Sequence, residues 1–411
     1  MLSKTDAEGV RAHNRRVVLN HLRRTGISTR RAISEATGLS MSSASSIASA
    51  LVRDSILVEM QDNERDFRRG RPERRLVLRA EAARVAVVKI AVGEIAVRLC
   101  SYDGQTLAHV RREMSIADLD ADRLVDAILE LLAEVRAMTG ASPTEGGTIE
   151  SITVAVQGKT DPGEGRIVWS PAMRLRDLLV GPPLAEATGA LVAVCNDCSL
   201  MPESFRWRSE GRLQNYAFVF IGFGVGMGLR VAGRNFGGQG VSTIEFGHIN
   251  HIPGGAACRC GNRGCVEAYA GDYALWRRAR GLEANAILAR RISDAEMRQL
   301  AAEARSSEGA AREAFEEAGL AIGYGLGRIF TLIDPLPIVF TGSGAQAIDL
   351  LEPAIRRGIT ESSIAGQGAD VEFSIEDDVD ALVFEAAANH ALAGIDERFA
   401  TATTPKAEAA E

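Results

Sequence analysis

Residues 258–267 are Cys-Arg-Cys-Gly-Asn-Arg-Gly-Cys-Val-Glu, and a histidine lies ten positions before the first cysteine. Three thiolates and one imidazole make a closed tetrahedral zinc site, and the two glycines allow the tight turns around the ion. A closed site has no open position for water, so we expect a structural rather than a hydrolytic zinc. Buried inert cysteines or a redox pair are the alternatives. The expected ligands are His248, Cys258, Cys260 and Cys265.

Apolar strand-like segments alternate with helical ones around this run, which predicts α/β architecture. The pattern predicts a helix over 121–138 and strands over 152–156, 191–195, 216–221 and 338–341. A glycine-rich turn at 222–228 follows one strand and either cradles a phosphate or holds two backbones close. Cys195 and Cys198 have no second pair nearby, so ordinary packing is expected for them.

The first 60 residues predict a helix-turn-helix. A helical pattern ends at Gly26, Thr29 is placed to cap a second short helix that ends at Gly38, and Ser40 is placed to cap a third. Two short helices joined by a four-residue turn are typical of this motif, in which the second of the pair is the recognition helix. A generic helical subdomain is the alternative.

Two strands and a polar loop follow the third helix, as in a wing. The loop contains Arg-Gly-Arg-Pro from Arg69, a pattern similar to an AT-hook, whose arginines enter a narrow minor groove. A solvated basic loop is the alternative. Because the recognition helix is rich in serine, we expect phosphate contacts to dominate over base readout. The expected DNA contacts are Arg30, Arg31, Met41, Ser42, Ser43, Ser46, Arg69, Gly70 and Arg71.

The charge is unevenly distributed along the chain. Residues 1–80 carry 16 Lys and Arg against 9 Asp and Glu, whereas the remaining residues carry 31 against 45. We call residues 1–80 the head. A basic head followed by an acidic remainder is expected when only one end of the chain binds a polyanion. With 46% hydrophobic residues the chain can bury sizeable cores. Six cysteines are too few for a disulfide scaffold, and no signal peptide or membrane span is evident, so a reducing cytoplasm is expected.

Three features together resemble the ROK family (repressors, open reading frames and sugar kinases). They are Glu245-Phe246-Gly247-His248, the cysteine run through Glu267, and Asn196-Asp197. The resemblance covers essentially the whole chain, because many repressors of the family carry a similar winged helix and Arg-Gly-Arg-Pro wing. It implies an N-terminal winged helix-turn-helix followed by a two-lobed, actin-like ATPase (ribonuclease H-like) fold with a sugar held between the lobes.

The same resemblance implies a set of sugar-binding residues. Carboxylates, an amide and an imidazole suit adjacent sugar hydroxyls, which need fixed acceptors and donors. One ring nitrogen of His248 would bind zinc while the other faces the sugar. A simple turn after a strand is the alternative for the Asn-Asp pair. The implied sugar residues are Asn196, Asp197, Glu245, His248 and Glu267.

Asp197 matches the general base of the family's kinases, but the nucleotide site departs from the family pattern. Lys89 stands where an acidic residue is usual, Phe223 replaces a threonine and Met227 a glycine; only the glycine turn at 342–344 matches. We therefore predict a non-enzymatic, sugar-responsive transcriptional regulator, a repressor of carbohydrate genes that a sugar or sugar phosphate releases from operator DNA. An active ATP-dependent sugar kinase is the alternative, and a zinc-dependent scaffold is a third.

The expected organisation follows from these assignments. Residues 1–80 form the DNA-binding domain, 84–200 the first lobe, completed by a C-terminal helix over 380–399, and 201–379 the second lobe with the zinc; 400–411 form a disordered tail. The expected partners are double-stranded operator DNA, a sugar effector and one or three further copies of the chain, without a membrane.

Overall fold

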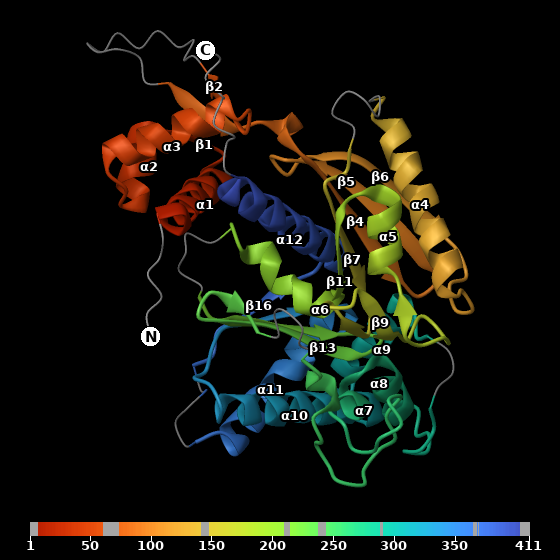
Figure 1. Ribbon diagram of the computed structural model, residues 1–411. Helices are drawn as coiled ribbons and strands as arrows, with labels where there is room; N and C mark the ends of the chain where they lie inside the picture. The colour runs from red at the N-terminus through yellow and green to blue at the C-terminus, as the bar shows by residue number, and fades with distance from the viewer. Residues whose placement is uncertain are drawn as a thin grey trace, which may run out of the picture. The chain divides into compact units, whose positions relative to one another are not determined.

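The computed structural model describes residues 7–60, 74–140, 148–208, 214–236, 244–287, 291–364, 368 and 370–402 (Figure 1). The chain divides into two compact units. The first unit comprises residues 1–195, 203–211 and 384–411, and the second comprises 196–202 and 212–383. The basic head thus belongs to the first unit; the domain boundaries expected from the sequence stay predictions.

Three helices and a small sheet form the head. Thr29 accepts the backbone N–H of Ala32, and Gly38 ends the second helix at φ +72°, so both predicted ends are confirmed. Ser40 accepts the N–H of Ser43 and caps the third helix, also as predicted. The elements are α1 (Ala7–Thr25), β1 (Ile27–Thr29), α2 (Arg30–Thr37), α3 (Met41–Arg53), β2 (Leu57–Met60) and β3 (Arg75–Leu78), with sheet order β1-β3-β2.

A five-stranded sheet of order β11-β7-β4-β5-β6 forms the main core of the first unit. β4 pairs in parallel with β7 and antiparallel with β5. Helix α4 (Ala121–Met138) packs its apolar stripe against this sheet and has the predicted bounds (Figure 1). The strands are β4 (Arg84–Ala91), β5 (Glu94–Ser101), β6 (Thr106–Glu113), β7 (Ser151–Val156) and β11 (Leu191–Asn196).

Shorter elements complete the first unit. A sheet of order β10-β9-β8 lies between β7 and β11 in the sequence. These elements are η1 (Ala80–Ala82), β8 (Lys159–Asp161), β9 (Arg166–Trp169), β10 (Leu178–Leu179), α5 (Gly181–Thr188) and η2 (Met201–Phe205), the last beginning in the second unit.

The last described helix, α12, spans Val379–Thr401. Its residues up to Val383 belong to the second unit and the others to the first. Phe384 packs between the guanidinium of Arg98 and the ring of His109, both on the main sheet of the first unit. The helix continues two residues beyond the predicted end because Ala400 is still buried. Residues 403–411 of the predicted tail lie outside the described residues.

The second unit is built on a sheet of order β14-β13-β12-β15-β16. β12 pairs in parallel with β15, and β12 and β13 form the hairpin that contains the glycine-rich turn. The strands are β12 (Tyr216–Ile221), β13 (Val225–Val231), β14 (Arg234–Asn235), β15 (Ile338–Thr341) and β16 (Phe373–Glu376). The helices are α6 (Asp197–Leu200), η3 (Phe246–His248), α7 (Glu267–Ala270), α8 (Asp272–Ala279), α9 (Asp294–Ser306), α10 (Ala310–Phe330), η4 (Ser343–Ala347) and α11 (Ile348–Ser362).

Helices α10 and α11 pack closely below this sheet (Figure 1). A Cβ on Gly319 would lie 2.6 Å from the carbonyl oxygen of Leu351, and one on Gly323 would lie 2.9 Å from the Cα of Gly358. The glycines of α10 therefore serve close helix packing. Within the described part of the chain, no helix is both long and apolar enough to span a bilayer.

Candidate functional site

The four predicted metal ligands lie together in the second unit. Nδ1 of His248 is 3.7 Å from Sγ of Cys258, and the Sγ atoms of Cys260 and Cys265 are 3.8 Å apart. All four ligand atoms lie within 4.8 Å of one another. A tetrahedral ion with Zn–S near 2.3 Å and Zn–N near 2.0 Å separates its ligand atoms by about 3.5–3.8 Å. The donor set therefore fits one four-coordinate ion.

The local sequence explains this convergence. Gly261 and Gly264 adopt φ +95° and +80°, and a Cβ on Gly264 would overlap the carbonyl oxygen of Ile252. The loop closes through the N–H of Cys258, which donates to the carbonyl of Asn262 at 3.0 Å. Only glycine readily takes these turns, so the glycine spacing dictates the fold of the loop.

Burial favours the protonated form of Cys258 and Cys265 when no ion is present. It raises the pKa of Cys265 to about 11 and raises the pKa of Cys258 further, with the Glu267 carboxylate adding to the effect. Binding of a metal must therefore displace protons from these cysteines. Burial likewise raises the pKa of Cys195, in the first unit, to about 12, and that of Cys198 well above its usual value, as expected for packed, unreactive thiols.

The residues implied for sugar binding all belong to the second unit. Asn196 and Asp197 lie at the junction of β11 and α6, where their side chains accept the N–H groups of Ser199 and Cys198 at 2.8 Å. Both are buried, as is Glu267 at the start of α7. These hydrogen bonds fix the orientation of the two side chains, and the Asn196 bond is the N-cap of α6. A cap of this kind also fits the simple turn, so the sugar-binding role of the pair stays a prediction.

The first residues of β13 bring these side chains to one region. Cβ atoms on Gly226 or Gly228 would overlap α6 at Cys198, so these glycines let the helix approach the strand. Val225, the first residue of β13, makes two further contacts. A Cβ on Gly247 of η3 would overlap the Val225 carbonyl, and the Val225 N–H donates to Oε2 of Glu267 at 3.3 Å. The glycine-rich turn therefore holds backbones close.

His248 has different neighbours at its two ring nitrogens. Nδ1 faces the cysteines, whereas Nε2 lies 3.7 Å from Oε2 of Glu245. The Glu245 side chain is 46% exposed, so this carboxylate is accessible to a solute. The ring thus lies between the metal-ligating cluster and one of the carboxylates implied for sugar binding.

Arg259, which belongs to the cysteine run, packs against the glycine-rich turn. The guanidinium of Arg259 lies 4.1 Å from the ring of Phe223 and 4.2 Å from that of Tyr273, and it donates to the Phe223 carbonyl at 3.0 Å. This stack occupies the turn where the family's kinases have a threonine. No sequence pattern indicates it, because the three residues come from separate segments.

The second glycine turn, at 342–344, is also closed by protein contacts. Cβ atoms on Gly342 and Gly344 would overlap Ile221, and the hydroxyl of Ser343 donates to both carboxylate oxygens of Asp272 at 3.0 and 3.1 Å. Burial raises the pKa of Asp272 to about 7. In the first unit, the buried Lys89 pairs with Glu94 at 3.4 Å.

The predicted DNA contacts within the described residues lie in the head. Arg30 pairs with Glu59, which also accepts Arg74 at 2.6 Å, and these hydrogen bonds lower the pKa of Glu59. Arg31 pairs with Glu35 at 2.9 Å on the exposed face of α2. The ion pair with Glu59 of β2 therefore holds the Arg30 side chain against the small sheet of the head.

The start of α3 presents its side chains to solvent. Met41 is 52% exposed, Ser42 and Ser46 are exposed, and Ser43 is half-buried beside the capping Ser40. A hollow of about 420 Å³ lies between this helix and Glu59. The wing residues Arg69, Gly70 and Arg71 lie outside the described residues.

A model of the ROK family matches residues 85–379. The chain therefore belongs to the ROK family.

One curated relative and one solved structure are similar to most of the chain. The chain is 22% identical to the xylose repressor of Bacillus spizizenii over 86% of this chain and 88% of the relative. A solved ROK family transcriptional regulator, a homologue of the Escherichia coli MLC protein, is 22% identical, with a TM-score of 0.75 over 94% of this chain and 99% of that one. The predicted fold class is confirmed.

A kinase shares the fold as well. A ROK family glucokinase from Streptomyces griseus, solved with glucose and AMPPNP, is 20% identical, with a TM-score of 0.56 over 75% of this chain and 99% of that one. This likeness shows the fold of the ROK domain and not its activity.

Proposed function

We propose that this chain is a sugar-responsive transcriptional repressor whose ROK domain binds a sugar or sugar phosphate without phosphorylating it. The observation that carries the proposal is Arg259 stacked between Phe223 and Tyr273 in the glycine-rich turn. Phosphoryl transfer needs a backbone cradle for phosphates, whereas this turn carries a phenylalanine side chain with an arginine packed on it. A relative that matches 86% of this chain is itself named as a xylose repressor.

The sugar binds, in this proposal, at the polar residues around the start of β13. Asp197 and Glu267 are oriented by backbone N–H groups and serve as acceptors for sugar hydroxyls, while Glu245 and Nε2 of His248 supply the accessible side. The four-ligand cluster would hold a structural Zn²⁺, which fixes the His248 tautomer when bound.

The head binds operator DNA through α3 and its basic neighbours. The exposed serines at the start of α3 are suited to phosphates, and the arginines supply a salt-dependent attraction to the duplex. Paired heads in a homodimer or homotetramer would read two half-sites, and such a protein acts in the cytoplasm. Tenfold weaker operator binding on addition of sugar needs about 1.4 kcal/mol of coupling between the two sites.

The Asp197→Ala variant tests the sugar site. Operator affinity without sugar should stay unchanged, because the residue lies outside the head, whereas sugar-induced release should be lost. Binding to operator DNA is measured against a panel of sugars and sugar phosphates. Asp334→Ala is the matched control, since it removes an exposed carboxylate from the same unit. Normal induction of the Asp197→Ala protein would reject the site.

An active sugar kinase is the second candidate, because Asp197 retains the position of the family's general base. The two functions separate in one assay on the full chain. A kinase turns over ATP in a sugar-dependent manner, and that turnover vanishes in Asp197→Ala, whereas a repressor shows salt-sensitive duplex binding with no turnover.

A further inference from the structure

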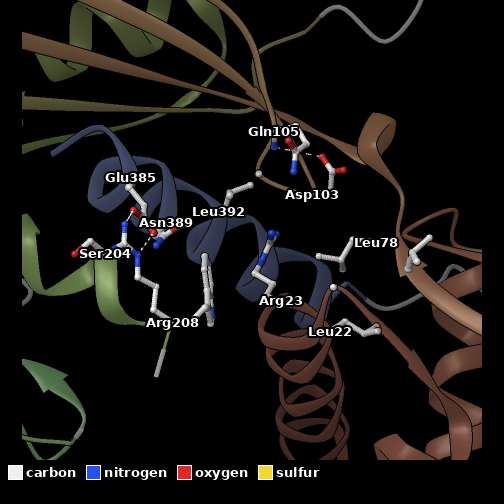
Figure 2. Close-up of a pocket in the computed structure, with 14 residues that line it drawn as sticks. Leu22, Arg23, Leu78, Asp103, Gln105, Ser204, Arg208, Glu385, Asn389 and Leu392 are labelled. Carbon is white, nitrogen blue, oxygen red and sulfur yellow. Dashed lines mark hydrogen bonds and ion pairs between the residues drawn. The ribbon is translucent and has the colours of Figure 1, made fainter. Parts of the chain in front are cut away.

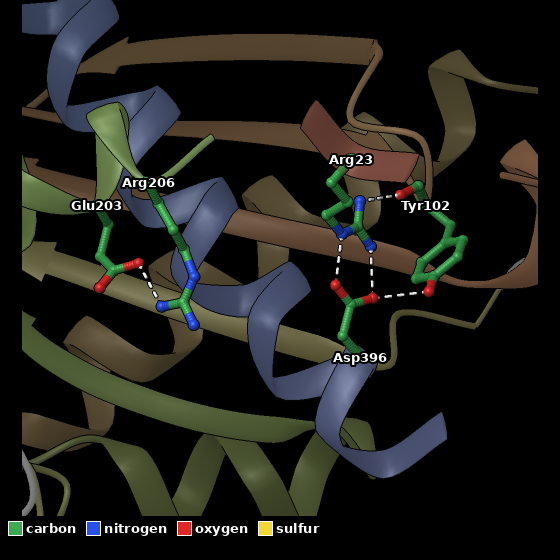
Figure 3. A network of polar contacts seen from close by, with 5 residues as sticks. All are labelled: Arg23, Tyr102, Glu203, Arg206 and Asp396. Carbon is green, nitrogen blue, oxygen red and sulfur yellow. Dashed lines mark hydrogen bonds and ion pairs between the residues drawn. The ribbon is translucent and has the colours of Figure 1, made fainter. Parts of the chain in front are cut away.

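One buried ion pair in the first unit joins the DNA-binding head to the C-terminal helix. The guanidinium of Arg23, in the last turn of α1, donates to both carboxylate oxygens of Asp396 in α12, at 2.6 and 2.8 Å (Figure 3). Its third nitrogen donates to the carbonyl of Tyr102 at 2.7 Å, and the Tyr102 hydroxyl donates to Asp396 at 2.6 Å. Every nitrogen of the guanidinium thus has a partner.

The pair is withdrawn from solvent, since the side chains of Arg23 and Asp396 are each 3% exposed. The guanidinium also lies 4.4 Å from the ring of Tyr102 and 5.0 Å from that of Trp207. Burial by itself would lower the pKa of Arg23, but the Asp396 carboxylate outweighs it and holds that pKa above its usual value. The Arg23 guanidinium therefore stays charged although it is buried, and the Asp396 carboxylate is its buried partner.

A cavity beside this ion pair interrupts the apolar packing between the head and α12. A cavity of about 660 Å³ lies beside Arg23, with Leu22 and Leu78 of the head on one side and Asn389 and Leu392 of α12 on the other (Figure 2). Apolar packing is therefore interrupted at this place. A second ion pair, Arg16 with Glu397 at 2.7 Å, joins the same two helices, but its side chains are 43% and 52% exposed.

We propose that Arg23, Asp396 and Tyr102 are positioning residues that make the head and α12 one body, so that a displacement of α12 is carried to the DNA-binding helices. This inference rests on the proposed function. Helix α12 begins in the second unit, which carries the proposed sugar site, and continues without a break to Asp396. A rigid element held at both ends is the physical connection that coupling between two sites requires.

The chemistry of the pair predicts what its loss does. Removing one partner of a buried ion pair leaves a charge without compensation, which is strongly unfavourable. In a closed core that charge stays trapped, but here Arg23 regains water when the head leaves α12. Undocking of the head is therefore the expected response, while the rest of the fold remains.

Two adjacent residues of α12 provide a matched test. Asp396→Asn removes the buried carboxylate, and Glu397→Gln makes the same change in the exposed pair. Backbone hydrogen exchange on the full chain should be at least about tenfold faster over the last turns of α1 in Asp396→Asn, and unchanged in Glu397→Gln. Operator binding should persist in Asp396→Asn, whereas the sugar should no longer change the affinity.

Further variants separate undocking from misfolding. Tyr102→Phe removes only the hydroxyl donor and should give a smaller effect in the same direction. The double variant Arg23→Met, Asp396→Leu leaves no buried charge and should restore slow exchange in α1. Unchanged exchange in Asp396→Asn, equal acceleration in Glu397→Gln, or a full sugar response from an undocked head would each overturn the proposal. If the wild type shows no sugar response, the proposed function fails, while the exchange comparison still decides whether the pair holds the head.

Discussion

Asp272 holds a carboxyl group at the start of α8, where the Ser343 hydroxyl is its hydrogen-bond donor. Burial is the main reason that its pKa is raised from 3.8 to about 7, and Asp294 adds to this, while the hydrogen bond and Arg291 and Arg259 oppose it. The folded state therefore holds a proton that the unfolded chain releases near pH 4. The contribution of this group to stability is full below pH 4 and is lost as the pH rises toward 7.

The Asp272→Asn variant should remove this pH dependence. An amide keeps the acceptor for Ser343 without a charge, so the variant should match wild type near pH 4 and exceed it above pH 7, by up to about 4 kcal/mol. Chemical denaturation at pH 5, 6, 7 and 8 measures the difference. A constant difference across this range would show that the carboxyl group is already charged when folded.

Local sequence patterns predicted which residues of one loop lie together better than they predicted contacts between distant segments. The spacing of Cys258, Cys260 and Cys265 indicated one cluster because the glycines between them permit only tight turns. By contrast, nothing near Phe223 in the sequence indicates Arg259, and no local pattern indicates that Arg30 pairs with Glu59; its contact with DNA stays a prediction. Contacts between separate segments depend on packing, which local patterns do not contain.

The close packing of helices α10 and α11 depends on the absence of a Cβ atom at single glycines of α10. Gly323 faces the backbone of α11, where a Cβ would overlap the carbonyl of Ile355. The contact is backbone against backbone, so no side-chain rotation can relieve an overlap. The interface between these helices is therefore set by glycine.

The Gly323→Ala variant should lose about 2–4 kcal/mol of stability, because the two helices must move apart and their core contacts loosen. Thermal or chemical unfolding of the full chain gives the value. Gly394→Ala is the control, since Gly394 lies in α12 with no atom within 4 Å of its Cβ position. Alanine there should be neutral or raise stability by about 1 kcal/mol, and equal losses at both positions would contradict the packing argument.

The whole molecule has separate cores in its two units. One apolar cluster runs from Ala217 to Val371, entirely in the second unit, and another from Ala86 to Val194 lies in the first. The metal-ligating cluster belongs only to the second unit. Such an arrangement permits two unfolding transitions instead of one.

Metal removal should therefore act on one unit. A strong chelator should lower the unfolding temperature of the second unit by several degrees or more and leave that of the first unchanged, because bound metal stabilises only the unit that holds it. Scanning calorimetry with and without added Zn²⁺ measures this. Cys260→Ser should reproduce the effect without chelator; a shift of both transitions, or of neither, would argue against a structural ion.

Amino-acid order by itself determined the helix ends at Thr29, Gly38 and Ser40 and the bounds of α4, and it indicated that His248, Cys258, Cys260 and Cys265 lie together. The reason is that capping and turn formation act over a few residues. Short motifs indicated the resemblance to the ROK family, and the match of the family model confirmed it. The tertiary structure alone decided that Arg23 meets Asp396, 373 positions away, and that a stacked arginine packs against the glycine-rich turn. Such pairings depend on the path of the whole chain. A buried charge is unfavourable unless it is paired, and its partner can come from any segment that folding brings near it.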